Sequence, residues 1–470
     1  MAMGRRKHRQ RGLWIETGRL ARGPGHPFYQ RLNELLAREG FDAFAEVACE
    51  KFYAEVMGRP SLPPGVYFRL LLIGYFEGID SERGIAWRVA DSLALREFLG
   101  FELTQGTPDH STLSRTRRLI AQETHEEVFT WVVCLLARHG LLRGKTLAID
   151  ATTLEANAAL RSIVRRDTGE SYQQFLERLA KASGIATPTR EDLARIDRDR
   201  GGKGSNDEWR HPHDPEARIA KMKDGRTHLA HKAEHVVDLE TGAIIAVTVQ
   251  TTDGGDAASS KATLQEAMDV IADVMEDAEA AAALSPTVFA ELVADKGYHS
   301  NAVLQAQAEL GIRTYISEPR RGKRRWGGKE KARAAVHANR RRMRGEHGKR
   351  LSRRRGEYVE RGFAHNYETG AMRRVHLRGH TNIRKRLVVH TAALDLGLVM
   401  RKAFGAGTPR GLAARLRRLT DRLSAAYRHC CALIASHAAR WWAAAANALG
   451  LSPRFTLFLS SAHGTCTTGC

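Results

Sequence analysis

The stretch LAIDATTLEA, residues 147–156, decides the fold of this 470-residue chain. Its apolar and β-branched residues predict a strand, yet Asp150 stands in the middle of it. A buried carboxylate is costly unless it finds a partner, shifts its pKa or binds a metal. Two further acids stand in comparable settings, Asp295 in ELVADKGYHS and Glu360 in EYVERGFAH. Three separated carboxylates of this kind suit a site that holds a divalent metal against phosphate.

The charge of the chain predicts a polyanionic partner. Lys and Arg number 74 against 53 acids, a formal net charge of +21. Residues 320–361 hold 18 Lys and Arg against 4 acids, which is +14 of that total. We interpret this tract as a nucleic-acid contact, with a solvated face as the alternative. Its predicted DNA-contacting residues are Arg324, Arg325, Trp326, Arg340, Arg341, Arg342, Arg353, Arg354 and Arg355.

No segment of the sequence indicates secretion or a membrane. The N-terminus, MAMGRRKHRQRGLW, is basic but lacks the apolar core of a signal peptide. No apolar run reaches the length of about 18 residues that a membrane span needs. The six cysteines have no repeated spacing, which is typical of reduced thiols. We therefore expect a cytoplasmic protein.

The first 138 residues have a helical pattern. Helices are expected at residues 31–47, 63–79, 81–101 and 111–139. Asp109 or Ser111 is the candidate cap of the last helix, which carries Arg115, Arg117 and Arg118 along its exposed side. We interpret residues 1–138 as a helical DNA-binding domain, although a purely structural helical platform has the same pattern.

Strand signals begin at Lys145. Strands are expected at residues 146–156, 227–239, 243–252, 287–295 and 313–318, with helices on either side of the fourth strand and another after the basic segment 320–355. Three antiparallel strands followed by parallel β–α–β units is the order of the ribonuclease-H-like fold, in which the first and fourth strands are neighbours. Asp150 and Asp295 would then lie about 5 Å apart across one strand spacing. That separation lets two carboxylates flank a pair of Mg²⁺ ions.

Two segments lie outside this core. Residues 157–225 form a polar insertion in which Trp209 is expected to be a small hydrophobic anchor, and residues 401–470 form a helical extension with a loose tail. The histidines at 228, 231 and 235 could suggest zinc together with HPHD at 211–214. However, His228 falls on the opposite strand face from the other two and no Cys joins them, so we expect no metal there.

Seven motifs occur in a particular order along residues 58–363. They are GRPSLPPGVYFRLLLIGYFEGIDSER (58–83), REFLGF (96–101), PDHSTLSRTRR (108–118), LAIDATTLEANA (147–158), DPEAR (214–218), VADKGYHS (293–300) and VERGF (359–363). With this ordered set the chain resembles the DDE-type bacterial insertion-sequence transposases. The group it resembles has a helical N-terminal domain ahead of a ribonuclease-H-like catalytic domain.

The resemblance implies an α/β protein: a ribonuclease-H-like mixed sheet flanked by helices at 144–400, an all-α domain at 1–138 and a helical C-terminal extension. It implies a cut-and-paste enzyme with Asp150, Asp295 and Glu360 as its catalytic, metal-binding triad. The cofactor would be two Mg²⁺ ions, or Mn²⁺ in their place. The partners would be double-stranded DNA, both terminal inverted repeats and target, and a second copy of the chain during synapsis in the nucleoid.

Near the aspartate of the fourth strand, Lys296, Tyr298 and His299 are predicted to touch flanking phosphate, with turn packing as the alternative for Tyr298 and His299. Trp326 could stack on a base or simply pack. Two rival functions stay open. One is a catalytically inactive DNA-binding protein of transposase descent, and the other is a structure-specific nuclease on the same fold.

The third carboxylate has a rival in Glu357, one helical turn before Glu360. Val359 and Phe363 mark the expected buried stripe of this helix, which places Glu360 at its edge and Glu357 on the far side. The chain also departs from its relatives here. Gly356 stands where a basic residue is usual before the Glu, and Asn366 and Tyr367 stand where one is usual after it.

Overall fold

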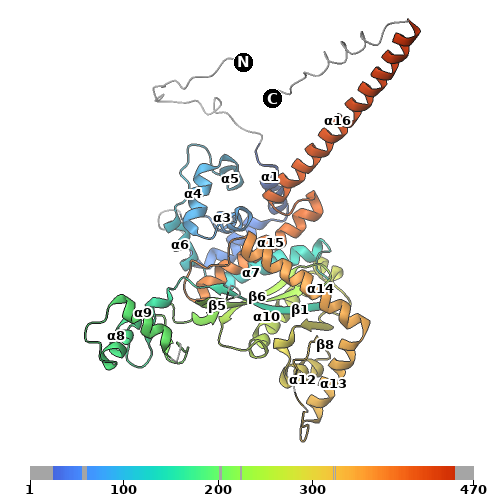
Figure 1. Cartoon of the computed structure of the whole chain (residues 1–470). Helices are drawn as coiled ribbons and strands as arrows, with labels where there is room; N and C mark the ends of the chain where they lie inside the picture. The colour runs from blue at the N-terminus through green and yellow to red at the C-terminus, as the bar shows by residue number, and fades with distance from the viewer. Residues whose placement is uncertain are drawn as a thin grey trace. The chain divides into compact units, whose positions relative to one another are not determined.

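The structure is a computed structural model that describes residues 25–54, 61–200, 204–222, 225–320, 322 and 324–449. The described residues up to Pro409 form one compact unit, and those from Arg410 belong to a second. Both are drawn in Figure 1. Within the described residues, no helix is both long enough and apolar enough to cross a bilayer.

A six-stranded mixed sheet forms the centre of the first unit. Its strands are β1 (Thr146–Glu155), β4 (Arg218–Lys221), β5 (Thr227–Asp238), β6 (Ile244–Thr251), β7 (Glu291–Ala294) and β8 (Arg313–Ile316). Their order is β4-β5-β1-β7-β8, and β6 also pairs with β5. β1 runs antiparallel to β5 and parallel to β7. The predicted ribonuclease-H-like arrangement, with the first and fourth core strands as neighbours, is therefore confirmed.

Local sequence explains where these strands start and stop. Gly242, with φ of +86°, closes the β5–β6 hairpin in a conformation that other residues rarely adopt. β7 is shorter than the predicted 287–295 because the chain bends just before it. Phe289 has φ of +49° and its amide donates to the Gly144 carbonyl, so pairing with β1 begins only at Glu291.

Helices cover both faces of the sheet (Figure 1). On one face lies α10 (Asp256–Glu276), whose Thr263 hydroxyl donates to Glu234 of β5. On the other face lies α14 (Glu346–Phe363), where the Phe363 ring contacts His235, the next residue of β5. Adjacent strand residues point to opposite faces, so the two contacts define the two layers. α12 (Asn301–Glu309) and α13 (Glu330–Arg344) pack beside β8.

The N-terminal part is helical, as predicted, but its segments are more broken. The helices are α1 (Pro27–Arg38), α2 (Phe41–Cys49), α3 (Pro64–Glu77), α4 (Glu82–Asp91), α5 (Leu93–Phe98), α6 (His110–Leu119) and α7 (Gln122–Arg138). Gly40 in the left-handed region separates α1 from α2. Ser92 ends α4 and caps α5 through Leu95 N–H, and Asp109 caps α6. Similarly, Asp277 divides a predicted single helix into α10 and α11 (Ala278–Ala283).

Helix α15 (His380–Phe404) joins the N-terminal helices to the sheet, packing against α3, α7 and β6. Buried Arg386 donates to the carbonyls of Leu71 and Ile79, and buried Asp395 accepts from the Ile244 amide at 3.1 Å. The sequence gives no distinct signal for this helix. It is buried on nearly every side, so its apolar residues show no one-sided period.

The segment predicted as a polar insertion has its own small core. It contains α8 (Tyr172–Ala182), α9 (Arg190–Asp199) and the paired strands β2 (Val164–Arg165) and β3 (Trp209–Arg210). Trp209 is buried with Ile163 and Leu229, which confirms its predicted role as an anchor. In Figure 1, α8 and α9 stand beside the sheet in green.

The second unit consists of α16 (Pro409–Ala448) where it is described. A helical C-terminal extension was predicted there. The tail SSAHGTCTTGC lies outside the described residues. The division of the chain into domains at residues 138 and 400 stays a prediction.

Candidate active site and nucleic-acid interface

Two of the three predicted carboxylates meet at the centre of the sheet. Ile149 and Ala294 are partners in the parallel pair β1–β7, so Asp150 and Asp295 follow directly on neighbouring strands. Asp150 lies in the middle of β1 rather than at a strand end. Burial raises the pKa of Asp150 above its ordinary value, and the charge of Asp295 acts in the same direction. The two carboxylates therefore lie close enough to repel each other.

The charge on Asp150 is balanced by an arginine. Arg355 of α14 donates from Nη2 to Asp150 Oδ2 at 2.5 Å, and the Ala151 amide donates to Oδ1 at 2.9 Å. The two side chains are 21% and 15% exposed, so this ion pair is largely sheltered from water. Arg355 was predicted to contact DNA, but in the structure it neutralises the central aspartate.

The predicted third carboxylate, Glu360, does not join this pair. It is exposed, while Val359 and Phe363 are buried and confirm the predicted apolar stripe of α14. Glu360 follows Arg355 by five residues, which is about 140° around a helix axis. Because Arg355 points at Asp150, Glu360 points elsewhere. Glu357 pairs with Arg361 on the exposed side.

A fourth carboxylate, which sequence analysis missed, lies beside Asp295. Asp256 is the first residue of α10, and its carboxylate and that of Asp295 converge on Gly297. A Cβ at residue 297 would lie 2.3 Å from Asp256 Oδ2 and 3.0 Å from Asp295 Oδ1, so a larger residue there would displace the Asp256 carboxylate. Asp256, Asp295, Lys296 and Glu318 help to line a hollow of about 630 Å³.

Behind Asp295, buried polar groups tie three elements together. Lys232 of β5 donates to Asp256 Oδ1 at 2.7 Å and to Ser259 Oγ at 2.8 Å. Tyr298 is buried and donates to Glu234 Oε1 at 2.8 Å. This network fixes the turn that carries Asp295. Two charged residues, 232 and 234, on one face of a strand were the sequence signal that could have revealed it.

The predicted phosphate contacts next to Asp295 are only partly exposed. Lys296 is exposed, but Tyr298 and His299 are each 1% exposed. The phenol of Tyr298 donates its hydrogen bond to Glu234, as described above. For these two residues the structure agrees with turn packing, because the short 3₁₀ turn 296–298 directs them inward.

The basic tract folds into α13 and α14, and many of its arginines bind within the protein. Arg340 donates to both carboxylate oxygens of Glu318 at 2.6 and 2.8 Å, and Arg342 donates to the carbonyl and hydroxyl of Thr314 at 2.9 and 3.0 Å. Arg324 also pairs with Glu318, at 3.1 Å, and Arg354 donates to the Glu240 carbonyl.

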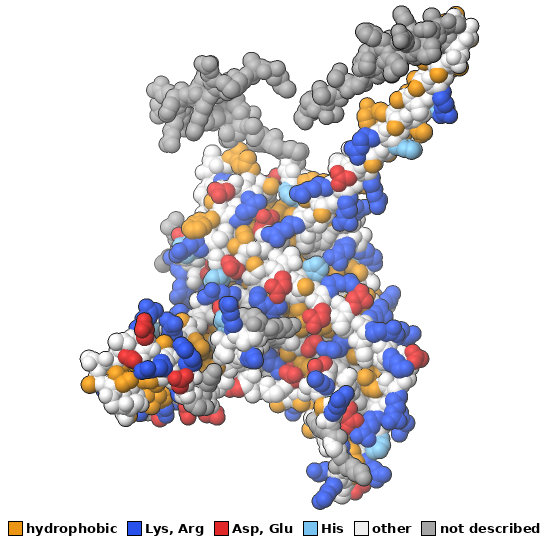
Figure 2. Space-filling view, viewed as in Figure 1, with side chains coloured by type: hydrophobic (Ala, Val, Ile, Leu, Met, Phe, Trp, Pro, Cys, Tyr) orange, Lys and Arg blue, Asp and Glu red, His pale blue; other side chains and the backbone are white. Residues whose placement is uncertain are grey.

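Some basic side chains of this tract remain available for phosphate. Arg325, Arg341 and Arg353 are exposed and make no ion pair with any described residue. Figure 2 shows Lys and Arg side chains gathered over the side where α13 and α14 lie. Trp326, predicted as a possible stacking residue, lies against Arg324 and His337, with the Arg324 guanidinium 5.4 Å from its ring centroid.

Among the DNA contacts predicted for the N-terminal helices, the one assigned to Arg117 is wrong. It is 6% exposed, its Nε donates to Glu82 at 2.7 Å and its Nη1 donates to Asn382 at 2.5 Å. It therefore joins α6 to α4 and α15 instead of facing DNA. Arg115 and Arg118 are exposed, and their bonds to described residues stay within their own helix.

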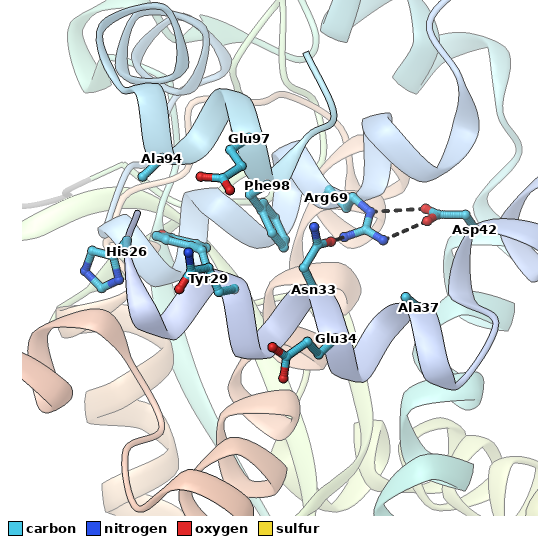
Figure 3. A pocket seen from close by; sticks show the side chains of 11 residues that line it. His26, Tyr29, Asn33, Glu34, Ala37, Asp42, Arg69, Ala94, Glu97 and Phe98 are labelled. Atoms are coloured by element: carbon cyan, nitrogen blue, oxygen red, sulfur yellow. Dashed lines mark hydrogen bonds and ion pairs between the residues drawn. The ribbon is translucent and has the colours of Figure 1, made fainter. Parts of the chain in front are cut away.

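A second hollow, of about 460 Å³, lies among the N-terminal helices α1, α3 and α5 (Figure 3). Its arginine, Arg69, is already bound by Asp42 at 2.7 Å and by Asn33 at 2.5 Å. Glu34 and Glu97 add further negative charge to the lining. The one arginine among the described lining residues is therefore already paired, and we do not assign this hollow to the active site.

Comparison with known families agrees with this architecture. The family described as "Transposase domain (DUF772)" matches residues 19–119, and the family described as "Transposase DDE domain" matches residues 204–396. The second match includes Asp295 and Glu360, whereas β1 with Asp150 lies before it. No curated protein matches the chain significantly.

Proposed function

Since this chain belongs to the DDE-type insertion-sequence transposases, we propose that it binds the inverted repeats of its element, cleaves DNA there and joins the freed ends to target DNA. The observation that carries the proposal is the placement of Asp150 and Asp295 after paired residues of two central parallel strands. The N-terminal helices and the exposed arginines of α13 and α14 would hold the duplex.

The residues around Asp150 and Asp295 suit a hard divalent cation only in part. Two carboxylates that repel each other in a sheltered place are the donor type that Mg²⁺ prefers. Among the described residues, however, no three acidic, His or Cys side chains are close enough to hold a metal together. We propose Asp150 and Asp295 as ligands, with Glu360 as the third. Mg²⁺, or Mn²⁺ in its place, supplies Lewis acidity and neutralises phosphate when bound.

Two bond exchanges make up the proposed reaction. In the first, a water oxygen bonds to phosphorus at the element end, the bond to the 3′ oxygen breaks, and that oxygen takes up a proton. In the second, the resulting 3′-hydroxyl gives up its proton and bonds to a target phosphorus, while the bond to the target's own 3′ oxygen breaks and that oxygen takes up a proton. Asp150 and Asp295 would flank the reacting phosphorus in both exchanges. Joining two element ends requires two sites, so we propose a homodimer in the synaptic complex.

The assignment of Glu360 requires a movement. In the structure Arg355 contacts Asp150, and Glu360 lies about 140° away around α14. We propose that binding of DNA and metal releases Arg355 and turns α14, so that Glu360 faces the aspartates. A π-helical stretch, Ala364–Thr369, directly follows α14, and such irregular turns occur often at functional sites.

One observation favours a second candidate, a DNA-binding protein of transposase descent without catalysis. Asn366 and Tyr367 stand where relatives carry a basic residue, and both are buried. Asn366 donates to Thr391, so the position serves the core. A structure-specific nuclease is less favoured, because the N-terminal match is to a transposase domain.

Cleavage of DNA that carries the flanking genomic repeats decides between these functions. With Mg²⁺, the wild-type chain should nick that DNA at the repeat end, and Asp150→Asn, Asp295→Asn and Glu360→Gln should each abolish nicking. The matched control is Glu357→Gln, which should cost less than about tenfold because Glu357 faces solvent and pairs with Arg361. Specific binding of the repeats without any nicking would favour the inactive protein.

A further inference from the structure

A pocket that none of the residues proposed above lines lies at the far end of β1. It has a volume of about 450 Å³ and is enclosed by the end of β1, the loop after β3, the start of β5 and the segment 374–378. The polar residues on its walls are Glu155, Asn157, Ser162, His211, His213, His228, Arg374 and Arg378. It thus forms where the insertion meets the catalytic sheet.

Backbone hydrogen bonds hold the walls of this pocket in place. The Glu155 amide donates to the Arg373 carbonyl at 2.9 Å, and the Val375 amide donates back to the Glu155 carbonyl at 2.9 Å. The amide side chain of Asn157 donates to the His376 carbonyl at 2.8 Å. The segment 374–378 therefore continues the sheet as a short extra edge beside β1, and its arginines are held at the pocket.

The DPEAR motif at 214–218 supports the same wall. Asp214 accepts from the Gly379 amide at 3.3 Å and from His231 at 3.2 Å, and Glu216 accepts from the His380 amide at 2.5 Å. The motif therefore anchors the chain just after Arg378. In the sequence DPEAR is one of the motifs that carry the family resemblance, and in the structure it shapes this pocket.

The charges in the pocket favour an anion. The carboxylate of Glu155 lies 3.6 Å from Arg374 and 3.8 Å from His228, so it is shared between two partners. Arg378 uses Nε to donate to the Asn157 carbonyl, and its terminal amino groups have no acceptor among the described residues. Two arginines against one carboxylate leave a net positive charge before any histidine is counted.

His211 is the group that indicates a ligand. It is 3% exposed and lines the pocket, and its buried Nδ1 has no hydrogen-bond partner among the described residues. A buried polar atom without a partner is costly, and a ligand in the pocket could supply the missing partner of His211. Burial lowers the pKa of His211, and the charge of Arg378 lowers it further, while Asp214 acts against this. A neutral imidazole can still donate one N–H to phosphate.

We propose that this pocket, the β1-end pocket, binds a phosphate of the DNA backbone through Arg378, His211 and Arg374. The inference rests on the proposed function, because it assigns a new contact to the DNA that the active site cleaves. Backbone phosphate is the fitting ligand because the pocket combines arginine forks with an N–H donor.

The position of this phosphate relative to the cleaved bond follows from β1. Asp150 and Glu155 are five residues apart on one continuous strand, about 17 Å at about 3.3–3.4 Å per residue. A DNA duplex advances about 3.4 Å per base pair. For a duplex whose axis runs along β1, the pocket would hold a phosphate about five base pairs from the cleaved bond, on the same DNA end.

A scan with neutral phosphates tests the proposal. Duplexes of the repeat end carry one methylphosphonate each, at positions three to eight base pairs from the cleaved bond on either side. Affinity is measured for the full-length wild type, for Arg378→Gln and for Arg374→Gln. The control is Arg195→Gln in α9, an exposed arginine of the same insertion that pairs with Asp192 and is not among the residues that line the pocket. Thermal unfolding checks that each variant is folded.

We expect a methylphosphonate at one position, or at either of two adjacent positions, to weaken wild-type binding by about fivefold or more. Arg378→Gln should weaken binding to unmodified DNA by a similar factor and should lose the extra penalty at those positions. Arg195→Gln should keep that penalty. On random DNA, Arg378→Gln should lower the slope of log affinity against log salt by about one unit.

Three other results would each have a different meaning. If the methylphosphonate penalty is the same in Arg378→Gln as in wild type, and the salt slope is unchanged, the proposal is overturned. If inorganic phosphate without DNA stabilises wild type but not Arg378→Gln, and no coupling appears, the pocket takes a small free anion and not DNA. If wild type does not prefer the repeat over random DNA, the proposed function fails, while the salt slope still decides on the pocket.

Discussion

Replacing Arg355 by Gln should strengthen metal binding to the DNA-free protein. A cation at Asp150 must displace the Arg355 guanidinium, which donates to that carboxylate at 2.5 Å. A hydrogen bond to a charged group contributes roughly 1.5–3 kcal/mol. Because the side chains are still 21% and 15% exposed, the lower end of this range applies. A difference of about 1.4 kcal/mol is a factor of ten, so the Kd for Mn²⁺ should fall about tenfold in Arg355→Gln.

Calorimetric titration of Mn²⁺ into the DNA-free chain measures this change. Arg353→Gln is the matched control, because it removes the same charge from an exposed position of α14 that makes no ion pair with a described residue. Its Kd should stay within about twofold of wild type. Asp150→Asn should remove the binding signal. Equal or weaker Mn²⁺ binding in Arg355→Gln, compared with the control, would refute the view that Arg355 takes the place of the metal charge.

Three further predictions use other parts of the structure. Gly297→Ala should reduce DNA nicking by about tenfold to a hundredfold without weakening DNA binding, since its Cβ would lie 2.3 Å from a carboxylate oxygen and displace it; nicking within twofold of wild type would contradict this. In salt titrations of DNA affinity, Arg341→Gln should flatten the slope by about one unit and Arg342→Gln should not, because Arg342 is bound to Thr314. Burial raises the pKa of Asp395 well above 3.8, so the protein loses stability as pH rises from about 4 through that higher pKa. Urea unfolding of wild type and Asp395→Asn at pH 5 and pH 8 should therefore show the variant gaining stability relative to wild type as pH rises. A difference in unfolding free energy that is the same at both pH values would disprove this.

The sequence predicted the sheet well because its signals are local. β1, β5, β6 and β8 lie within one or two residues of their expected bounds. A strand is recognised from a few consecutive residues, and a hairpin from the turn between two of them. The closeness of Asp150 and Asp295 followed from strand order, which a fixed sequence of strands and helices largely determines.

The helix that carries Glu360 shows where local signals end. The buried stripe of Val359 and Phe363 was predicted and confirmed, and it shows which side of α14 faces the sheet in the DNA-free chain. It does not decide which polar residue beside the stripe reaches Asp150. Arg355 and Glu360 both lie near its edges, and only packing against the sheet selects Arg355.

Consecutive residues alone were enough to establish the order of five of the six sheet strands, the two central aspartates and the net positive charge, whereas β4 (Arg218–Lys221) lies in the segment predicted as an insertion. Which of those charges are available depends on the folded chain. Arg117 and Arg342 look like Arg341 in sequence, yet the first two bind Glu82 and Thr314 inside the protein. An arginine carries the same charge whether it faces solvent or a partner, and that partner comes from a segment tens or hundreds of residues away that only folding brings into contact.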